Sequence, residues 1–133
     1  MYETIVVAID GSDHGRRAAE LAVDIGDTFE ATVQAVYVVD TPRYGGTDAG
    51  EVDLIEDLET RGADTLEDLE SQFGVSTAIR TGRPHQEIIE QAEEADADLL
   101  VLGNRGLGGE DGDEIGSVAE RVVRHAGRPV LTA

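Results

Sequence analysis

The sequence predicts an α/β protein, a five-stranded sandwich in which helices cover a parallel sheet. Two observations predict this class. Five apolar runs are short enough to be buried strands, and the segments between them place apolar residues at helical spacing. This alternation is typical of parallel sheets, because each crossover between parallel strands is long enough to hold a helix. A chain of 133 residues fits one domain covering residues 1–133.

The five strands are bounded by polar residues and glycines. They are expected at Thr4–Ile9, Thr32–Val39, Val75–Arg80, Asp98–Gly103 and Arg128–Ala133. The polar segment 40–51, which contains glycines and a proline, is expected to be a long loop.

Four helices are expected between the strands, the second of them within residues 52–73. Ser12 suits the cap of the first helix, Pro84 the first turn of the third, and Ser117 the cap of the fourth, which Gly127 ends. The side chains expected to face the sheet are Ala18, Leu21, Ala22 and Ile25 in the first helix and Leu54, Ile55, Leu58, Leu66 and Leu69 in the second.

The composition is extremely acidic. The chain has 29 acidic and 10 basic residues, a formal net charge of −19, and no lysine. Such a charge repels itself at low ionic strength, but at molar salt the Debye length falls to about 3 Å. We interpret the acidity as adaptation to a salt-loaded cytoplasm, as in a halophilic archaeon, with an ordinary acidic protein as the alternative. A nucleic-acid partner is not expected, since no basic patch could neutralise its phosphates.

Other classes are excluded by what the sequence lacks. It has no cysteine, which excludes disulfides, thiolate metal sites and cysteine catalysis. The start "MYETIVVAID" has no basic region before a long apolar stretch, and no segment is long enough to span a bilayer. We therefore expect a cytoplasmic protein without a membrane partner.

Three features fall at the carboxyl ends of expected strands, where open parallel sheets bind ligands. They are "AIDGS" after the first strand, "YVVD" in the second, and the glycine-rich segment "GNRGLGGEDGDEIGS" after the fourth. Asp10 could accept a ribose hydroxyl, hold a metal, or simply order the turn with Ser12. Glycines permit close backbone approach, and Ser117 would open a helix whose positive end favours an anion.

The glycine-rich segment also contains features that leave its role open. Arg105 could reach a phosphate or pair with a neighbouring acid. The acids Glu110, Asp111, Asp113 and Glu114 would repel a phosphate. No lysine follows the glycines as in a Walker A loop, and a dinucleotide fingerprint would follow the first strand instead.

The three histidines have no spacing that matches a metal motif. His14 and His85 lie near expected helix starts and His125 near a helix end. Each is expected to be a surface or capping residue.

The stretches "VVAIDGS", "GRPHQEIIEQAEEADADLLVLGNRG" and "GSVAERVVRHAGRPVLTA" resemble the universal stress protein family, and the resemblance covers Thr4 to Ala133. The segment from Gly103 also resembles the pattern of the ATP-binding branch of that family. The pattern consists of Gly, two residues, Gly, nine residues, Gly, and Ser or Thr. Here Gly103, Gly106, Gly116 and Ser117 occupy its fixed positions.

The resemblance implies a Rossmann-like open sheet with strand order 3-2-1-4-5 and a site for ATP. We expect Mg²⁺ to bind with the ATP, because it neutralises phosphate charge and accepts carboxylate or water ligands. Asp10 would face the ribose and the backbone of Val38 the adenine, while Gly116 and its successors would bind the phosphates. The residues expected at the ligand are Ala8, Asp10, Val38, Gly103, Asn104, Arg105, Gly106, Gly116, Ser117 and Val118. The resemblance also implies a homodimer through the last strand, Pro129–Thr132.

We therefore expect an ATP-binding, nucleotide-dependent regulatory or stress-response module. The sequence offers no clear nucleophile or general base, so any ATP hydrolysis is expected to be slow. One alternative is a nucleotide-free family member that works by protein association. The other is an ATP-using enzyme of the adenine-nucleotide α-hydrolase-like group, which would need a pyrophosphate-binding signature that "DGSDHG" does not supply.

The net charge predicts that the fold depends on salt. Lowering KCl from molar to tens of millimolar should cause cooperative unfolding, because the negative charges then repel each other unscreened. Circular dichroism at a series of KCl concentrations measures this. A thermal midpoint that stays constant from dilute buffer to molar KCl would contradict the halophilic interpretation.

Overall fold

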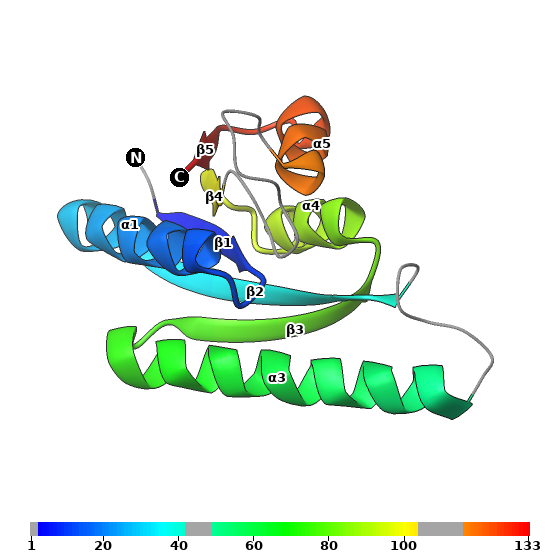
Figure 1. The fold of residues 1–133 in the computed structure, drawn as a ribbon. Helices are drawn as coiled ribbons and strands as arrows, with labels where there is room; N and C mark the ends of the chain where they lie inside the picture. Colours follow the sequence, from blue (N-terminus) through cyan, green and yellow to red (C-terminus); the bar gives the residue numbers. More distant parts are fainter. Residues whose placement is uncertain (1–2, 42–48, 104–115) are drawn as a thin grey trace.

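The computed structural model describes residues 3–41, 49–103 and 116–133. Strands and helices alternate along the chain (Figure 1). Their bounds are β1 Thr4–Ile9, α1 Asp13–Phe29, β2 Thr32–Asp40, α3 Ala49–Phe73, β3 Ser76–Gly82, α4 Pro84–Glu94, β4 Leu99–Leu102, α5 Ser117–His125 and β5 Val130–Thr132.

The five strands form one parallel sheet in the order β3-β2-β1-β4-β5, which confirms the expected fold class. β1 lies in the middle, and its side chains alternate between the two faces because successive strand residues point in opposite directions. Ile5 and Val7 pack toward α1 and α3, whereas Val6 and Ala8 pack toward α4 and α5. Helices therefore cover both faces of the sheet (Figure 1).

The local signals for helix starts are confirmed at two of three positions. Ser12 caps α1, since its Oγ accepts a hydrogen bond from the Gly15 amide at 3.2 Å. Pro84 occupies the first turn of α4. Ser117 does not cap α5: Gly116 takes the cap position, and Ser117 is the first residue of the helix.

The predicted helix faces are largely confirmed, with two exceptions. Leu21 is only half-buried, and Ala19 is buried in its place. Leu54 is 40% exposed, because only its neighbour Ile55 is turned toward the core on this part of α3. Adjacent helix positions differ by about 100° in direction, so Ile55 can face the core while Leu54 faces solvent.

Several boundaries also differ from those expected. The expected loop 40–51 is shorter, since Asp40 ends β2 and α3 already begins at Ala49. β3 continues to Gly82, whereas β4 and β5 are shorter than their apolar runs. The ends of these strands are set by pairing with their neighbours, and the apolar pattern of the sequence does not encode that pairing.

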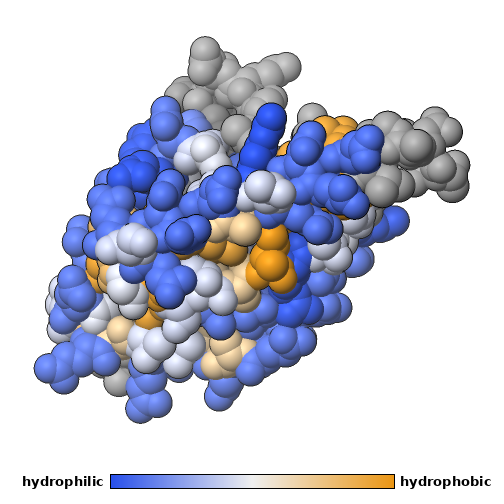
Figure 2. Space-filling model, turned by 90° about the horizontal axis from the view of Figure 1, so that it is seen from below, coloured by the Kyte–Doolittle hydropathy of each residue, from blue (hydrophilic) through white to orange (hydrophobic). Residues whose placement is uncertain are grey.

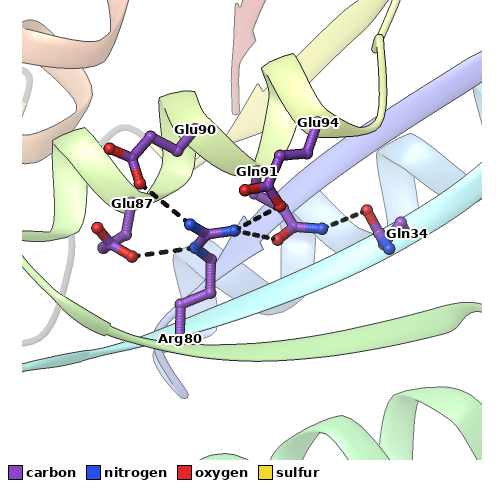
Figure 3. Close-up of polar contacts among 6 residues, drawn as sticks. All are labelled: Gln34, Arg80, Glu87, Glu90, Gln91 and Glu94. Atoms are coloured by element: carbon purple, nitrogen blue, oxygen red, sulfur yellow. Dashed lines mark hydrogen bonds and ion pairs between the residues drawn. The ribbon is translucent and has the colours of Figure 1, made fainter.

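The edge strand β3 is fixed to α4 by Arg80 (Figure 3). Its guanidinium donates to Glu87 at 3.0 Å, Glu94 at 2.9 Å and Glu90 at 3.1 Å. It also donates to the Oε1 of Gln91, whose Nε2 donates to Gln34 of β2 at 2.8 Å. This chain of contacts joins β2, β3 and α4 (Figure 3).

The Arg80 side chain is 18% exposed, so its charge is partly desolvated. Burial alone would lower the pKa of Arg80, but hydrogen bonds and charge attraction from Glu87 and Glu94 outweigh it and raise the pKa. The three carboxylates occupy one face of α4 and would repel each other without the cation. Arg80 therefore holds the edge of the sheet together. None of the helices in the described ranges combines the length and apolar character needed to cross a membrane.

Replacing Arg80 by Met should lower the unfolding free energy by about 2 kcal/mol, because partly buried Glu87 would lose its partner. The loss should stay below that of a fully buried pair, since Glu90 and Glu94 are 55% and 65% exposed. Arg16→Met is a matched control. Its pair with Glu20 is about half-exposed on both sides, so the cost should be under about 1 kcal/mol. Urea unfolding at fixed molar KCl measures both, and equal losses would contradict this role of Arg80.

Candidate functional site

The candidate site lies at the carboxyl ends of β1 and β4, where the strand order reverses. Ala8 of β1 pairs with Leu102 of β4, so the two neighbouring strands end side by side. The chain leaves β1 toward α1 on one face of the sheet, and α5 covers the other face (Figure 1). Open α/β sheets bind ligands at such a point, because the diverging connections leave a crevice between them.

Asp10 orders the turn between β1 and α1. Its Oδ1 accepts hydrogen bonds from both the backbone amide, at 2.9 Å, and the hydroxyl of Ser12. Gly11 lies between them with φ +85°, a conformation that favours glycine. Of the roles left open for Asp10, the structure therefore shows the turn-ordering one.

Gly103 follows β4 and lies against the first turn of α1. A Cβ placed on Gly103 would come within 2.9 Å of the backbone carbonyl carbon and the Cβ of His14, and within 3.0 Å of its carbonyl oxygen. Backbone atoms in a packed helix cannot yield cheaply to such a contact. The fold itself thus requires glycine at this position, and the close approach brings the start of α1 to the end of β4.

Among the residues that the structure describes, no side chain makes a capping hydrogen bond at the N-terminus of α5. Gly116 is the cap residue and makes no side-chain capping hydrogen bond, and its carbonyl accepts from Glu120 at 2.9 Å. Its backbone is extended, with φ −64° and ψ 154°, so any residue could adopt it. Uncapped amides and the helix dipole together favour an anion. Ser117 is exposed and Val118 half-buried against the core.

β2 continues past the end of β1 and forms one wall of the candidate site. The ladder between the two strands ends at the pair Ile9 and Tyr37, whereas Val38 pairs onward with Arg80 of β3. Val38 is thus positioned beside the end of β1, on the side where the strand ladder has stopped. Ala8 is buried in the core on the α4 and α5 face, so its side chain is a packing residue.

Most of the glycine-rich segment lies outside the residues that the structure describes. Outside the described residues lie Asn104, Arg105, Gly106, Glu110, Asp111, Asp113 and Glu114. The structure brings Asp10 and Gly103 to the first turn of α1, and Val118 at the start of α5 packs against the core cluster that includes Ala8 and Leu102. In the described part of the chain, no group of three or more His, Asp or Glu side chains could hold a metal ion.

Sequence reasoning missed two features beside the site. The packing of Gly103 on His14 joins segments far apart in the chain, and its one trace in the sequence is the glycine itself. The histidines do lie at helix ends, as expected, and His14 Nδ1 accepts from Arg17 at 3.1 Å. No pattern in the sequence indicated that burial, together with the charges of Arg121 and His125, would lower the pKa of His85.

A groove of about 710 Å³ lies elsewhere, between α3 and β3, with Ala63, Leu66, Thr77 and Ile79 among its lining residues. Seen from the side of α3, the surface is mostly hydrophilic with a smaller hydrophobic area in its middle (Figure 2). The groove contains none of the residues expected at the ligand. It is therefore separate from the candidate site.

Comparison with protein families supports the resemblance seen in the sequence. A model of the universal stress protein family matches residues 1–133. Universal stress protein MJ0531 of Methanocaldococcus jannaschii is 40% identical over 138 residues, which cover 98% of this chain and 81% of that protein.

Solved structures show the same fold. Universal stress protein UspA from Lactobacillus plantarum has a TM-score of 0.90 and 28% identity, with 98% of this chain and 97% of that chain covered. A universal stress protein solved in complex with cAMP has a TM-score of 0.64 and 28% identity, with 99% and 96% covered.

The packing at Gly103 predicts a steric effect of Gly103→Ala. The added Cβ would push against the backbone of His14, so we expect a loss of about 1–3 kcal/mol in unfolding free energy. Gly74→Ala serves as a control, since no atom lies within 4 Å of its added Cβ and only its φ of +69° is unfavourable. That variant should lose about 1 kcal/mol.

Urea unfolding and amide spectra of both variants test this. Gly103→Ala should also shift the amide resonances of the first turn of α1, and Gly74→Ala should not. Unchanged resonances at residues 13–16 in Gly103→Ala would show that the contact with His14 is not close.

Proposed function

The chain belongs to the universal stress protein family, and we propose that it is a single-domain cytoplasmic module that binds ATP and acts as a nucleotide-dependent regulator in the stress response. One observation carries the nucleotide part of this proposal. Val118, in the first turn of α5, packs against the core cluster that contains Ala8 of β1 and Leu102 of β4, and no side chain among the described residues caps this helix. Backbone amides at such a helix start are suited to phosphate oxygens.

The rest of the site fits the remaining parts of a nucleotide. The Asp10 turn would face the ribose, and the backbone of Val38, beyond the end of the β1 ladder, would meet the adenine. Ala8 would contribute by supporting the end of β1 from the core. Asn104, Arg105 and Gly106 would contact the sugar and phosphates, as the spacing of the glycines implies.

Gly116 supports the same interpretation. Its extended backbone does not by itself demand glycine, so close approach by a ligand gives the position a reason to lack a side chain. The relative solved with cAMP makes an adenine nucleotide a reasonable class of ligand for this fold. The choice of ATP rests on the spacing of Gly103, Gly106, Gly116 and Ser117.

We propose that Mg²⁺ enters with the nucleotide, held by phosphate oxygens and water. A divalent cation on the phosphates would reduce their repulsion by the acids of residues 110–114. High salt would weaken that repulsion further. We propose the excess of acids to be an adaptation to molar salt, as in a halophilic archaeon.

We propose that the protein binds ATP and does not hydrolyse it rapidly. The Oδ1 of Asp10 already accepts two hydrogen bonds from Ser12, which favours a positioning role over that of a general base. The module would also form a homodimer through β5. This strand pairs with β4 on one side, its residues are only half-buried, and an edge strand can pair with a second copy.

Calorimetry in molar KCl tests the proposal. ATP should bind, binding should strengthen with Mg²⁺, and Gly116→Val should abolish it by filling the approach to the α5 amides. Ser117→Ala is the matched milder variant: it keeps every backbone amide, so it should weaken binding by about tenfold at most. Circular dichroism checks that both variants fold.

One result of this calorimetry would contradict ATP binding. If the wild type gives no heat at millimolar ATP with Mg²⁺, and the purified protein retains no nucleotide, then the proposal is wrong. The chain would then work by protein association without a nucleotide.

A further inference from the structure

The outer edge of β3 lacks the usual protection against strand pairing. Among the described strands, β3 pairs with β2 alone, so backbone groups of alternate residues point away from the sheet. β3 pairs one to one with β2 from Ser76 to Gly82, so no bulge turns the edge aside. Its one charged side chain, Arg80, is bound to α4 instead of guarding the edge. Within the described part of the chain, this edge is therefore open to a further strand.

The groove between α3 and β3 provides apolar surface beside this edge. Its volume is about 710 Å³, and it is lined by buried Leu66 and by Ile79, which is 44% exposed. Ile79 lies on the α3 face of β3, because a Cβ added to Gly62 of α3 would come within 3.1 Å of its Cδ1. Viewed from the side of α3, hydrophilic surface surrounds a hydrophobic area (Figure 2). A side chain of a strand added to β3 would enter the groove and cover Ile79.

Acidic side chains border the groove on its α3 side. Ala63, Leu66, Glu67 and Glu70 line it at spacings of three and four residues, which places them on one stripe of the helix. Glu67 and Glu70 are exposed, and neither takes part in the ion pairs that join described residues. A cationic side chain beside the groove would therefore meet two carboxylates.

The opposite face of β3 is also anionic. There Glu87, Glu90 and Glu94 share the single guanidinium of Arg80, so negative charge remains in excess (Figure 3). Glu90 and Glu94 are 55% and 65% exposed. A segment that lies along the edge of β3 would thus have acids near it on both faces of the sheet.

We propose that the outer edge of β3 pairs with an extended, cationic segment of a partner protein. Hydrogen bonds to the β3 backbone supply affinity in such an arrangement, and side-chain pockets supply specificity. Here alternate apolar side chains of the segment enter the α3 and β3 groove, and its cations meet the acids of α3 and α4. This surface shares no residue with the expected nucleotide site, so the proposal does not depend on the nucleotide.

Other occupants fit this edge less well. If two copies of this chain paired through their β3 edges about a twofold axis perpendicular to the sheet, both α3 helices would lie on the same face. Glu67 and Glu70 of the two copies would then repel each other. A nucleic acid would be repelled by the same acids. A cationic polypeptide supplies both the backbone partners and the opposite charge.

Titration with a synthetic peptide tests the proposal. The peptide has seven residues, the length of β3, has blocked ends and alternates Val with Lys. It is added to the full chain without nucleotide, at the lowest KCl that keeps a native circular dichroism spectrum. We expect saturable shifts of the backbone amides of residues 63–71 and 76–82, and slower hydrogen exchange of the β3 amides that face away from β2. An unsaturable response, or shifts centred elsewhere, would overturn the proposal.

A methylated peptide separates strand pairing from charge attraction. N-methylation of the three central amides removes backbone donors from both edges of the peptide but keeps every charge and side chain. This peptide should bind at least about tenfold more weakly, since the strand ladder cannot form across its centre. Equal binding of the two peptides would show that charge alone attracts them, and the proposed strand pairing would be wrong.

Paired acid variants test the charge contribution. Glu67→Gln combined with Glu70→Gln should weaken binding of the unmethylated peptide by about fivefold, the effect of losing two exposed ion pairs. Asp64→Asn combined with Asp68→Asn is the matched control, because these acids are exposed on α3 but do not line the groove. The control should bind within about twofold of the wild type. Equal weakening by both double variants would contradict a role for the groove.

Ile79→Lys tests the groove and the identity of its occupant. The new side chain would remove apolar surface and repel the peptide, so binding should weaken by about tenfold or more. Light scattering should give the same mass as for the wild type. If Ile79→Lys instead dissociates an assembly that the wild type forms, a second copy occupies the edge and the proposal is overturned. If circular dichroism shows that this variant does not fold, the paired acid variants and the methylated peptide still decide.

Discussion

The site depends on the central position of β1 in the sheet. Because β1 is buried on both faces, the chain must place helices on both sides, and the strand order reverses between β1 and β4. The ends of these two strands therefore stand together, with Gly103 pressed against the first turn of α1. Hydrophobic packing in the middle of the sheet thus positions backbone amides at its carboxyl edge, and no catalytic side chain is needed to do so.

Charged side chains are distributed unevenly over the sheet and its helices. At the sheet edge, Arg80 neutralises Glu87, Glu90 and Glu94, which joins β3 to α4. On the other side of α4, burial lowers the pKa of His85, and the charges of Arg121, His125 and Arg83 lower it further. A chain with 10 basic residues thus uses one of them, Arg80, to hold three acids and the edge of its fold.

The sequence predicted the parts of the fold that local chemistry determines. Ser12 and Pro84 signal helix starts through a hydroxyl and a fixed backbone angle, and the apolar runs located all five strands. Ser117 was assigned to the cap because it has a hydroxyl, but the helix starts from Gly116, which carries no side chain to signal it. The strand order followed from the family resemblance, since apolar pattern does not specify which strands are neighbours.

The contacts that could not be predicted are those between distant segments. Gly103 matches the glycine pattern of the sequence. The contact that requires a glycine there, however, is with His14, at the other end of the chain. The spacing of Glu87, Glu90 and Glu94 showed a common helix face but not that Arg80 would reach it from a strand. The roles of Ala8, Asp10, Val38 and Val118 toward a ligand stay predictions, whereas the structure places Ala8, Asp10 and Val38 at the strand ends and packs Val118 against the core.

The most direct measurement is to follow the backbone amide resonances of the full chain during titration with ATP and Mg²⁺ in molar KCl. The account predicts saturable shifts at residues 10–12, 103 and 116–119, which surround the ends of β1 and β4, with the α3 and β3 groove unchanged. Shifts centred on that groove, or no shifts at saturating ATP, would contradict it.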